Sequence, residues 1–73
     1  MMSIQDIEVS NNIRKKIITA LRDDSVFIIE ENGDLIVSVE AYKVFAQRIK
    51  RSPLEEILGE DLLDFSSEYF VFN

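Results

Sequence analysis

The feature that most constrains the fold is a pair of apolar runs joined by Asn32-Gly33. Residues 26–31 and 34–39 flank this dipeptide, which tolerates the positive φ that a two-residue type I′ turn requires. The pattern therefore predicts a β-hairpin. Counting outward from the turn gives the pairs Ile29 with Ile36, Ile28 with Val37, and Val26 with Val39.

Both faces of this hairpin are apolar. In the predicted register one face carries Val26, Ile28, Leu35, Val37 and Val39, and the other carries Phe27, Ile29 and Ile36. A hairpin with one solvated face would alternate apolar with polar residues. We therefore expect cover on both faces, from the chain's own helices and from a second subunit.

Before the hairpin, the sequence predicts a short strand and then an amphipathic helix. Ile7 and Val9 alternate with acidic residues, which is a strand signal. Residues 11–22 repeat isoleucine and leucine at helical spacing, and Ser10 or Asn11 can cap that helix.

After the hairpin, the sequence predicts one long and one short helix. Ser38 is a good cap for the long helix, whose apolar stripe is Tyr42, Phe45, Ala46 and Ile49. Ser52-Pro53-Leu54-Glu55 is a helix start signal, and Gly59 should end the short helix at about Leu58. Beyond Gly59, residues 60–65 could add a helical turn and residues 68–72 could form a strand.

Charge divides the chain in two. All eight Lys and Arg residues lie between Arg14 and Arg51, whereas residues 52–73 contain acids and no base. We therefore divide the chain into residues 1–51, a dimerisation and DNA-binding domain, and residues 52–73, an acidic apolar partner-binding segment. With 73 residues in all, one small domain is the most that can form, and oligomerisation is expected.

The composition argues against several function classes. The chain has no Cys and no His, and its two glycines cannot build a phosphate-binding loop, so we expect no enzyme, no cofactor and no metal site. The longest apolar run, residues 26–29, is too short to span a bilayer, and we expect a cytoplasmic protein without membrane contact.

Two sets of side chains are candidate binding residues. The bases of the first helix would contact DNA phosphates, although they can equally be the solvated side of an amphipathic helix; they are Arg14, Lys15, Lys16 and Arg22. The C-terminal segment would bury apolar side chains against a basic partner and pair its acids with that partner's bases, although it can equally be a frayed end or a last strand that completes the core. Its candidate residues are Leu54, Ile57, Leu58, Asp61, Leu62, Asp64, Phe65, Glu68, Tyr69, Phe70 and Phe72.

Residues 9–38 resemble the core of the AbrB/MazE/VapB family of swapped-hairpin regulators and antitoxins. The similarity is carried by Val9-Ser10-Asn11-Asn12-Ile13-Arg14-Lys15-Lys16-Ile17 and by Asp24 to Val37 around Asn32-Gly33. A second resemblance is to the Phd/YefM antitoxins, through the hairpin and Ser38-Val39-Glu40-Ala41-Tyr42. Both resemblances imply a small dimer that represses its own promoter and neutralises a toxin.

We therefore predict an α+β domain that forms an intertwined homodimer through the hairpin and first helix. The function hypothesis is a type II antitoxin or related small regulator, with a cognate toxin or another basic protein as partner and operator DNA as a second ligand. The alternative is a small acidic protein-interaction module, such as an inhibitor or DNA mimic, that does not bind DNA. Its signature would be a C-terminal segment folded onto the domain. A structural domain with no partner is a third reading.

Overall fold

The computed structural model of the chain describes residues 3–22, 26–29, 32–60 and 67–73. Its elements, in chain order, are β1 (Ile4–Ile7), α1 (Asn11–Leu21), β2 (Phe27–Ile29), β3 (Leu35–Ser38), α2 (Val39–Ile49), α3 (Pro53–Leu58) and β4 (Tyr69–Phe72). The α+β class predicted from the sequence is confirmed. In the described part of the chain, no helix has the length and apolar character needed to cross a membrane.

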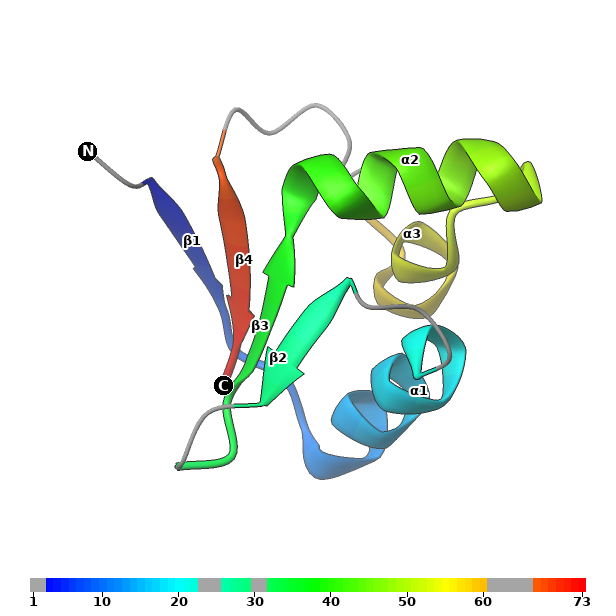
Figure 1. Cartoon of the computed structure of the whole chain (residues 1–73). Coiled ribbons are helices and arrows are strands. Elements are labelled where there is room, and N and C mark those ends of the chain that lie inside the picture. The colour runs from blue at the N-terminus through cyan, green and yellow to red at the C-terminus, as the bar shows by residue number, and fades with distance from the viewer. Residues whose placement is uncertain (1–2, 23–25, 30–31, 61–66) are drawn as a thin grey trace.

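The strands form one mixed sheet, and the three helices lie on one side of it (Figure 1). The strand order is β1-β4-β3-β2, in which β1 runs parallel to β4 and the other neighbours are antiparallel. The most C-terminal strand, β4, therefore lies between the first strand and the hairpin. Of the sequence interpretations of residues 68–72, the structure has the one in which they form a strand inside the domain's own sheet.

The first strand begins and ends earlier than the alternation of Ile7 and Val9 suggested. β1 covers residues 4–7, and beyond it the amide of Val9 donates to the carbonyl of Asn73 at 2.9 Å. Parallel pairing with β4 sets these bounds, because Ile4 is opposite Tyr69 and Ile7 is opposite Phe72.

The hairpin forms, but its predicted register is wrong by one residue. Ile28 pairs with Ile36 instead of Val37, and Phe27 pairs with Val37. A type I′ turn needs positive φ at both central residues. Gly33 has φ of 90°, but the observed pairs are centred on Asn32, so Asn32 and Gly33 are not the two central residues of a two-residue turn. The Asn32 side chain instead accepts a hydrogen bond from the amide of Asp34 at 3.2 Å, which is a local turn of a different type.

Serine caps start two of the helices as predicted. The Ser10 hydroxyl accepts from the amide of Ile13 at 3.2 Å, and the Ser38 hydroxyl accepts from the amide of Ala41 at 3.3 Å. Because Ser38 is both the last residue of β3 and the cap of α2, the chain turns from sheet to helix without a loop. This direct connection brings α2 back over the sheet.

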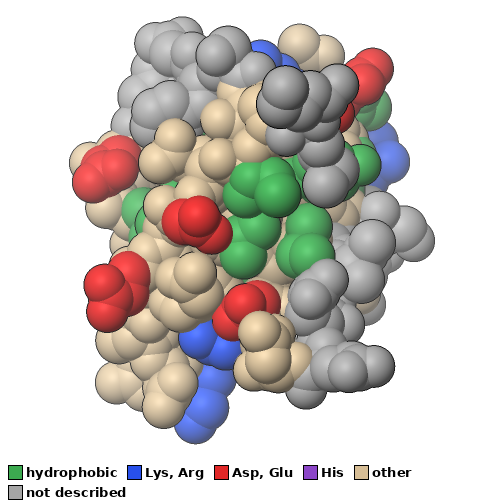
Figure 2. Space-filling model, turned by 90° about the vertical axis from the view of Figure 1, so that its left-hand side faces the viewer, with side chains coloured by type: hydrophobic (Ala, Val, Ile, Leu, Met, Phe, Trp, Pro, Cys, Tyr) green, Lys and Arg blue, Asp and Glu red, His purple; other side chains and the backbone are tan. Residues whose placement is uncertain are grey.

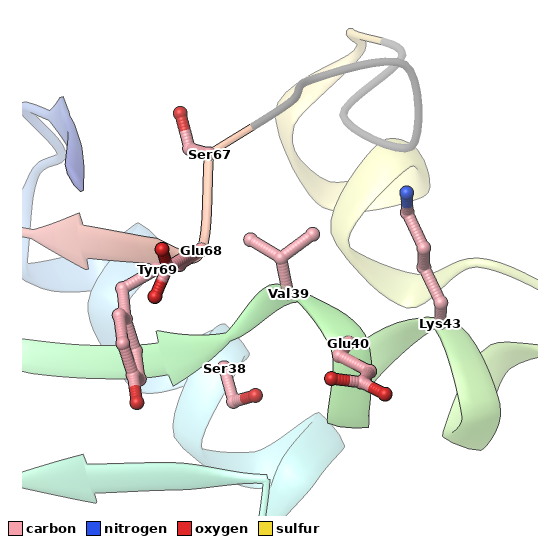
Figure 3. A pocket seen from close by; sticks show the side chains of 7 residues that line it. All are labelled: Ser38, Val39, Glu40, Lys43, Ser67, Glu68 and Tyr69. Carbon is pink, nitrogen blue, oxygen red and sulfur yellow. The ribbon is translucent and has the colours of Figure 1, made fainter. Parts of the chain in front are cut away.

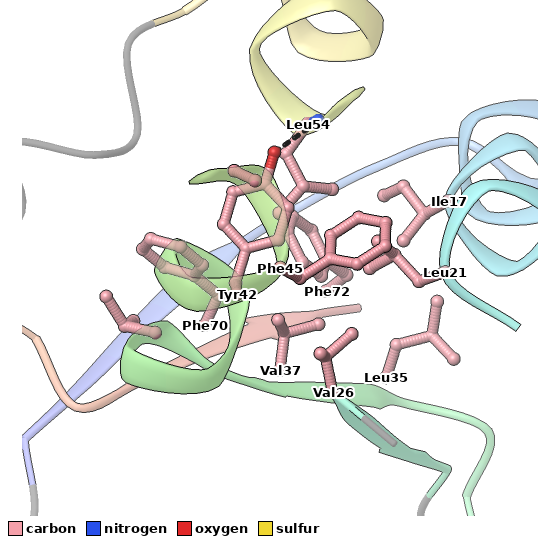
Figure 4. Close-up of a cluster of buried hydrophobic side chains, with 12 residues drawn as sticks. Ile17, Leu21, Val26, Leu35, Val37, Tyr42, Phe45, Leu54, Phe70 and Phe72 are labelled. Carbon is pink, nitrogen blue, oxygen red and sulfur yellow. Dashed lines mark hydrogen bonds between the residues drawn. The ribbon is translucent and has the colours of Figure 1, made fainter. Parts of the chain in front are cut away.

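The third helix starts differently from the prediction. Pro53 and Gly59 bound α3 as expected, with Gly59 at φ of 71°, but the Ser52 side chain makes no cap hydrogen bond. The hydroxyl of Tyr42 takes that role: it accepts from the amide of Leu54 at 2.9 Å and lies 2.7 Å from the Ser52 hydroxyl (Figure 4). One side chain of α2 thus completes the first turn of α3.

The core lies between the helices and one face of the sheet (Figure 4). Tyr42 is at its centre and is fully buried. Burial raises the pKa of the Tyr42 hydroxyl, while its hydrogen bonds to Ser52 and Leu54 act in the opposite direction. The other large, fully buried side chains come from the helices and from β3 and β4, and they are Ile17, Leu21, Leu54, Leu35, Val37, Phe70 and Phe72.

Candidate functional site

The face of the sheet opposite the helices carries a group of apolar side chains. Successive residues of a strand point to opposite faces. Leu35, Val37, Phe70 and Phe72 point into the core and are at most 1% exposed. The residues that alternate with them therefore lie on the other face, which we call the open face.

Strand pairing brings four apolar residues of the open face together. Ile36 of β3 is opposite Val71 of β4, and Tyr69 of β4 is opposite Ile4 of β1. Ile4 is 47% exposed, and the other three are half-buried. We call Ile4, Ile36, Tyr69 and Val71 the open-face patch. It is apolar, contiguous across three strands, and not covered by any described helix (Figure 1).

The open face also has an acidic character. Its view in Figure 2 shows apolar side chains gathered near the centre with carboxylates around them, and Lys and Arg towards the margins. Asp6 of β1 lies opposite Val71, next to the open-face patch. None of the four strands contains a Lys or Arg, because all the bases are in the helices or in the segments that follow α1 and α2.

A hollow of about 390 Å³ adjoins the open-face patch at Tyr69 (Figure 3). It lies where β3 ends, α2 begins and β4 begins, and its lining residues are Ser38, Val39, Glu40, Lys43, Ser67, Glu68 and Tyr69. The Ser38 hydroxyl already accepts the capping bond of α2. The hollow extends the surface that a bound protein could contact.

The predicted DNA-contacting residues are not equally available for contact with DNA. The Nη1 atom of Arg14 donates to the carbonyl of Gly33 at 2.6 Å, so this guanidinium holds the hairpin turn against α1. Its Nε atom is buried without a hydrogen-bond partner among the described residues. Lys15 and Lys16 are exposed and line a groove between α1 and α3, and Arg22 is exposed at the end of α1.

The helical side holds the remaining bases, and among them Arg51 pairs with Glu56. The Nη2 atom of Arg51 lies 2.6 Å from a carboxylate oxygen of Glu56. This hydrogen bond lowers the pKa of the Glu56 carboxyl and raises that of Arg51. Both side chains are more than half exposed, so the pair contributes little to stability.

Several of the predicted partner-binding residues are core residues. Leu54, Phe70 and Phe72 have no exposed surface, and Ile57 and Leu58 pack against the core. In the folded chain the first three cannot contact a partner. Their apolar character reflects the packing of α3 and β4 onto the rest of the domain.

The other predicted partner-binding residues fall into two groups. Tyr69 belongs to the open-face patch, and Glu68 is exposed beside it. The remaining four lie outside the described residues, and they are Asp61, Leu62, Asp64 and Phe65.

Sequence reasoning did not select Ile4, Asp6, Ile36 and Val71 as site residues. The signal for Ile36 was present, because the hairpin is apolar on both of its faces. Val71 joins that surface through the pairing of β4 with β3, and Ile4 and Asp6 join it through the pairing of β1 with β4. The local sequence pattern contains neither pairing.

The described residues contain no cluster of three or more acidic, His or Cys side chains that could hold a metal ion. Comparison of the chain with protein-family models, with curated proteins and with solved structures found no match.

Proposed function

We propose that this chain is a small protein-interaction module that binds a partner protein on the open face of its sheet. The observation that carries the proposal is the open-face patch, which joins apolar side chains of three strands on a face without helices. Single exposed apolar residues are common on protein surfaces, whereas contiguous apolar patches mark interaction sites. The exposed acids beside the patch, Asp6 and Glu68, form an acidic rim. This rim would orient the partner and exclude proteins of the wrong charge.

The position of β4 favours this function over the antitoxin hypothesis. An antitoxin of the predicted kind would present residues 52–73 to its toxin as a separable segment. Phe70 and Phe72 are instead fully buried, and the amide of Leu54 is held by Tyr42. A C-terminal segment folded onto the domain is the signature expected of the interaction module. The apolar centre of the face also favours protein contact over DNA mimicry, which would need carboxylates across the whole surface.

The test uses a pair of variants with matched chemistry. Ile36→Ser with Val71→Ser would remove the centre of the open-face patch, whereas Val44→Ser removes an apolar side chain that is 59% exposed on α2. A partner obtained by crosslinking in the source cells would be purified and its affinity measured by calorimetry. We expect the double variant to bind at least tenfold more weakly and the Val44 variant to bind normally. Equal affinity of the wild-type and the double variant would refute the proposal.

A DNA-binding regulator is the second candidate, and the exposure of Lys15 and Lys16 is the observation that favours it. Such bases would contact phosphates and release counterions, so the affinity for duplex DNA would fall steeply with salt. Titration of a labelled duplex over a salt series tests this directly. Binding that weakens with salt and is lost on Lys15→Gln with Lys16→Gln would support the regulator. Absence of binding at low salt would exclude the DNA-binding regulator.

A further inference from the structure

We infer that the occupant of the open face is a cationic segment of a different protein, which places a Lys or Arg against Asp6 and an apolar surface against Val71 and Ile36. The inference rests on the proposed function, because it specifies the chemistry of the partner at the same surface. It is carried by the order of side chains across the strands and by the charges around them.

The three residues form a row across the sheet. Asp6 is opposite Val71, and Val71 is opposite Ile36. Since neighbouring strands are about 4.8 Å apart, Asp6 lies roughly 5 Å from Val71 and roughly 10 Å from Ile36 along the row. One basic side chain next to a short apolar stretch on the partner would satisfy all three positions.

The carboxylate of Asp6 is available for such a contact. It is exposed, and it has no ion pair or hydrogen bond with a described residue. Glu8, which follows β1, adds a second exposed carboxylate near the same edge of the sheet. The described strands contain no base that could neutralise these charges.

A second copy of the chain is a poor occupant. In a symmetric dimer the same patch would face itself, so both copies would bring Asp6 into one interface. A carboxylate that loses water without gaining a base or a donor is costly, and like charges across an interface repel. The net charge of −6 adds repulsion between the two copies. A basic partner removes each of these costs.

The probes are two synthetic amphipathic helical peptides that differ only in charge, one made of Leu, Ala and Lys and the other of Leu, Ala and Glu. Each would be titrated into the full chain while amide shifts are followed by NMR. We expect the Lys peptide to shift amides of β1, β3 and β4 and to bind at least tenfold more tightly than the Glu peptide.

Two charge-matched variants test the role of Asp6. Asp6→Asn should weaken binding of the Lys peptide about three- to tenfold at low salt, because an ion pair at a partly desolvated site contributes that much. Glu60→Gln removes the same charge after α3, on the helical side, and should change affinity less than twofold. Equal weakening by the two variants, or shifts confined to the helices, would overturn the inference.

Other outcomes separate this inference from the proposed function. If both peptides shift the open face with equal affinity, the face binds apolar segments without charge selection, and only the present inference fails. If the shifts of Ile36 and Val71 depend on protein concentration alone, and sedimentation shows a dimer, a second copy is the occupant and the inference again fails. The proposed function itself fails if the crosslinked partner binds the wild-type chain and the Ile36→Ser, Val71→Ser variant with equal affinity.

Discussion

Replacing Tyr42 with Phe tests whether the Tyr42 hydroxyl holds α3 in place. The hydroxyl accepts from the amide of Leu54 at 2.9 Å and bonds to Ser52 at 2.7 Å, and Leu54 is fully buried. Without the hydroxyl, the Leu54 amide keeps no acceptor and no access to water. A buried donor left unsatisfied costs about 1–3 kcal/mol. Ser52 is partly exposed and can bond to water instead, so losing its hydrogen bond to Tyr42 adds little to this cost.

We therefore expect Tyr42→Phe to lower the free energy of unfolding by about 2 kcal/mol, and the melting temperature by roughly 8–16 °C for a domain of this size. Urea denaturation followed by circular dichroism measures the first quantity, and a thermal melt measures the second. The exchange rate of the Leu54 amide proton should also rise.

Tyr69→Phe is the matched control. It deletes the same atom from a half-buried tyrosine on the open face, and surface changes of this kind stay within about 0.5 kcal/mol. Ser52→Ala should fall between the two variants, because it leaves the bond from Leu54 to Tyr42 intact. If Tyr42→Phe were no less stable than Tyr69→Phe, the hydroxyl would not be the cap of α3 and the reasoning would be refuted.

Two further predictions concern pH and the hairpin. Because burial raises the folded-state pKa of Tyr42 above its unfolded value, the contribution of Tyr42 to stability should be constant below about pH 10 and fall as pH rises beyond it. Urea titrations between about pH 8 and pH 11.5 should show a smaller decline in Tyr42→Phe, and an equal decline would contradict the assignment. Arg14→Met should cost about 1–2 kcal/mol in urea unfolding because it deletes the charged donor to the Gly33 carbonyl, whereas Lys15→Met should be nearly neutral. Equal stability of these two variants would show that Arg14 does not hold the turn.

The local features of the fold could be predicted because each depends on a few neighbouring residues. Ser10 and Ser38 cap helices as expected, and Pro53 and Gly59 bound α3. The register of the hairpin was missed because it depends on the type of turn, and Asn-Gly is compatible with more than one turn type.

The sheet and the candidate site could not be predicted to the same extent. Residues 68–72 carry a strand pattern, but their neighbours are set by contacts with segments far away in the sequence. The open-face patch shares this origin, since Ile4 meets Tyr69, and Ile36 meets Val71, only after β4 has entered the sheet. The predicted homodimer remains a proposal, and the acidic rim makes the open face an unfavourable place for it.

The sheet order also constrains when the domain can assemble. Ser3 and Glu68 are 65 residues apart in the sequence and are joined by a hydrogen bond, and β4 is the only described strand next to β1. While the ribosome is still making residues 67–73, β1 has no neighbour to pair with and β3 has a bare edge. Closing so long a loop has an entropic cost that slows folding. An unpaired strand edge can meanwhile pair with other chains. The nascent chain should therefore be most prone to aggregation before β4 emerges, and any chaperone that holds it should release it only after β4 has joined.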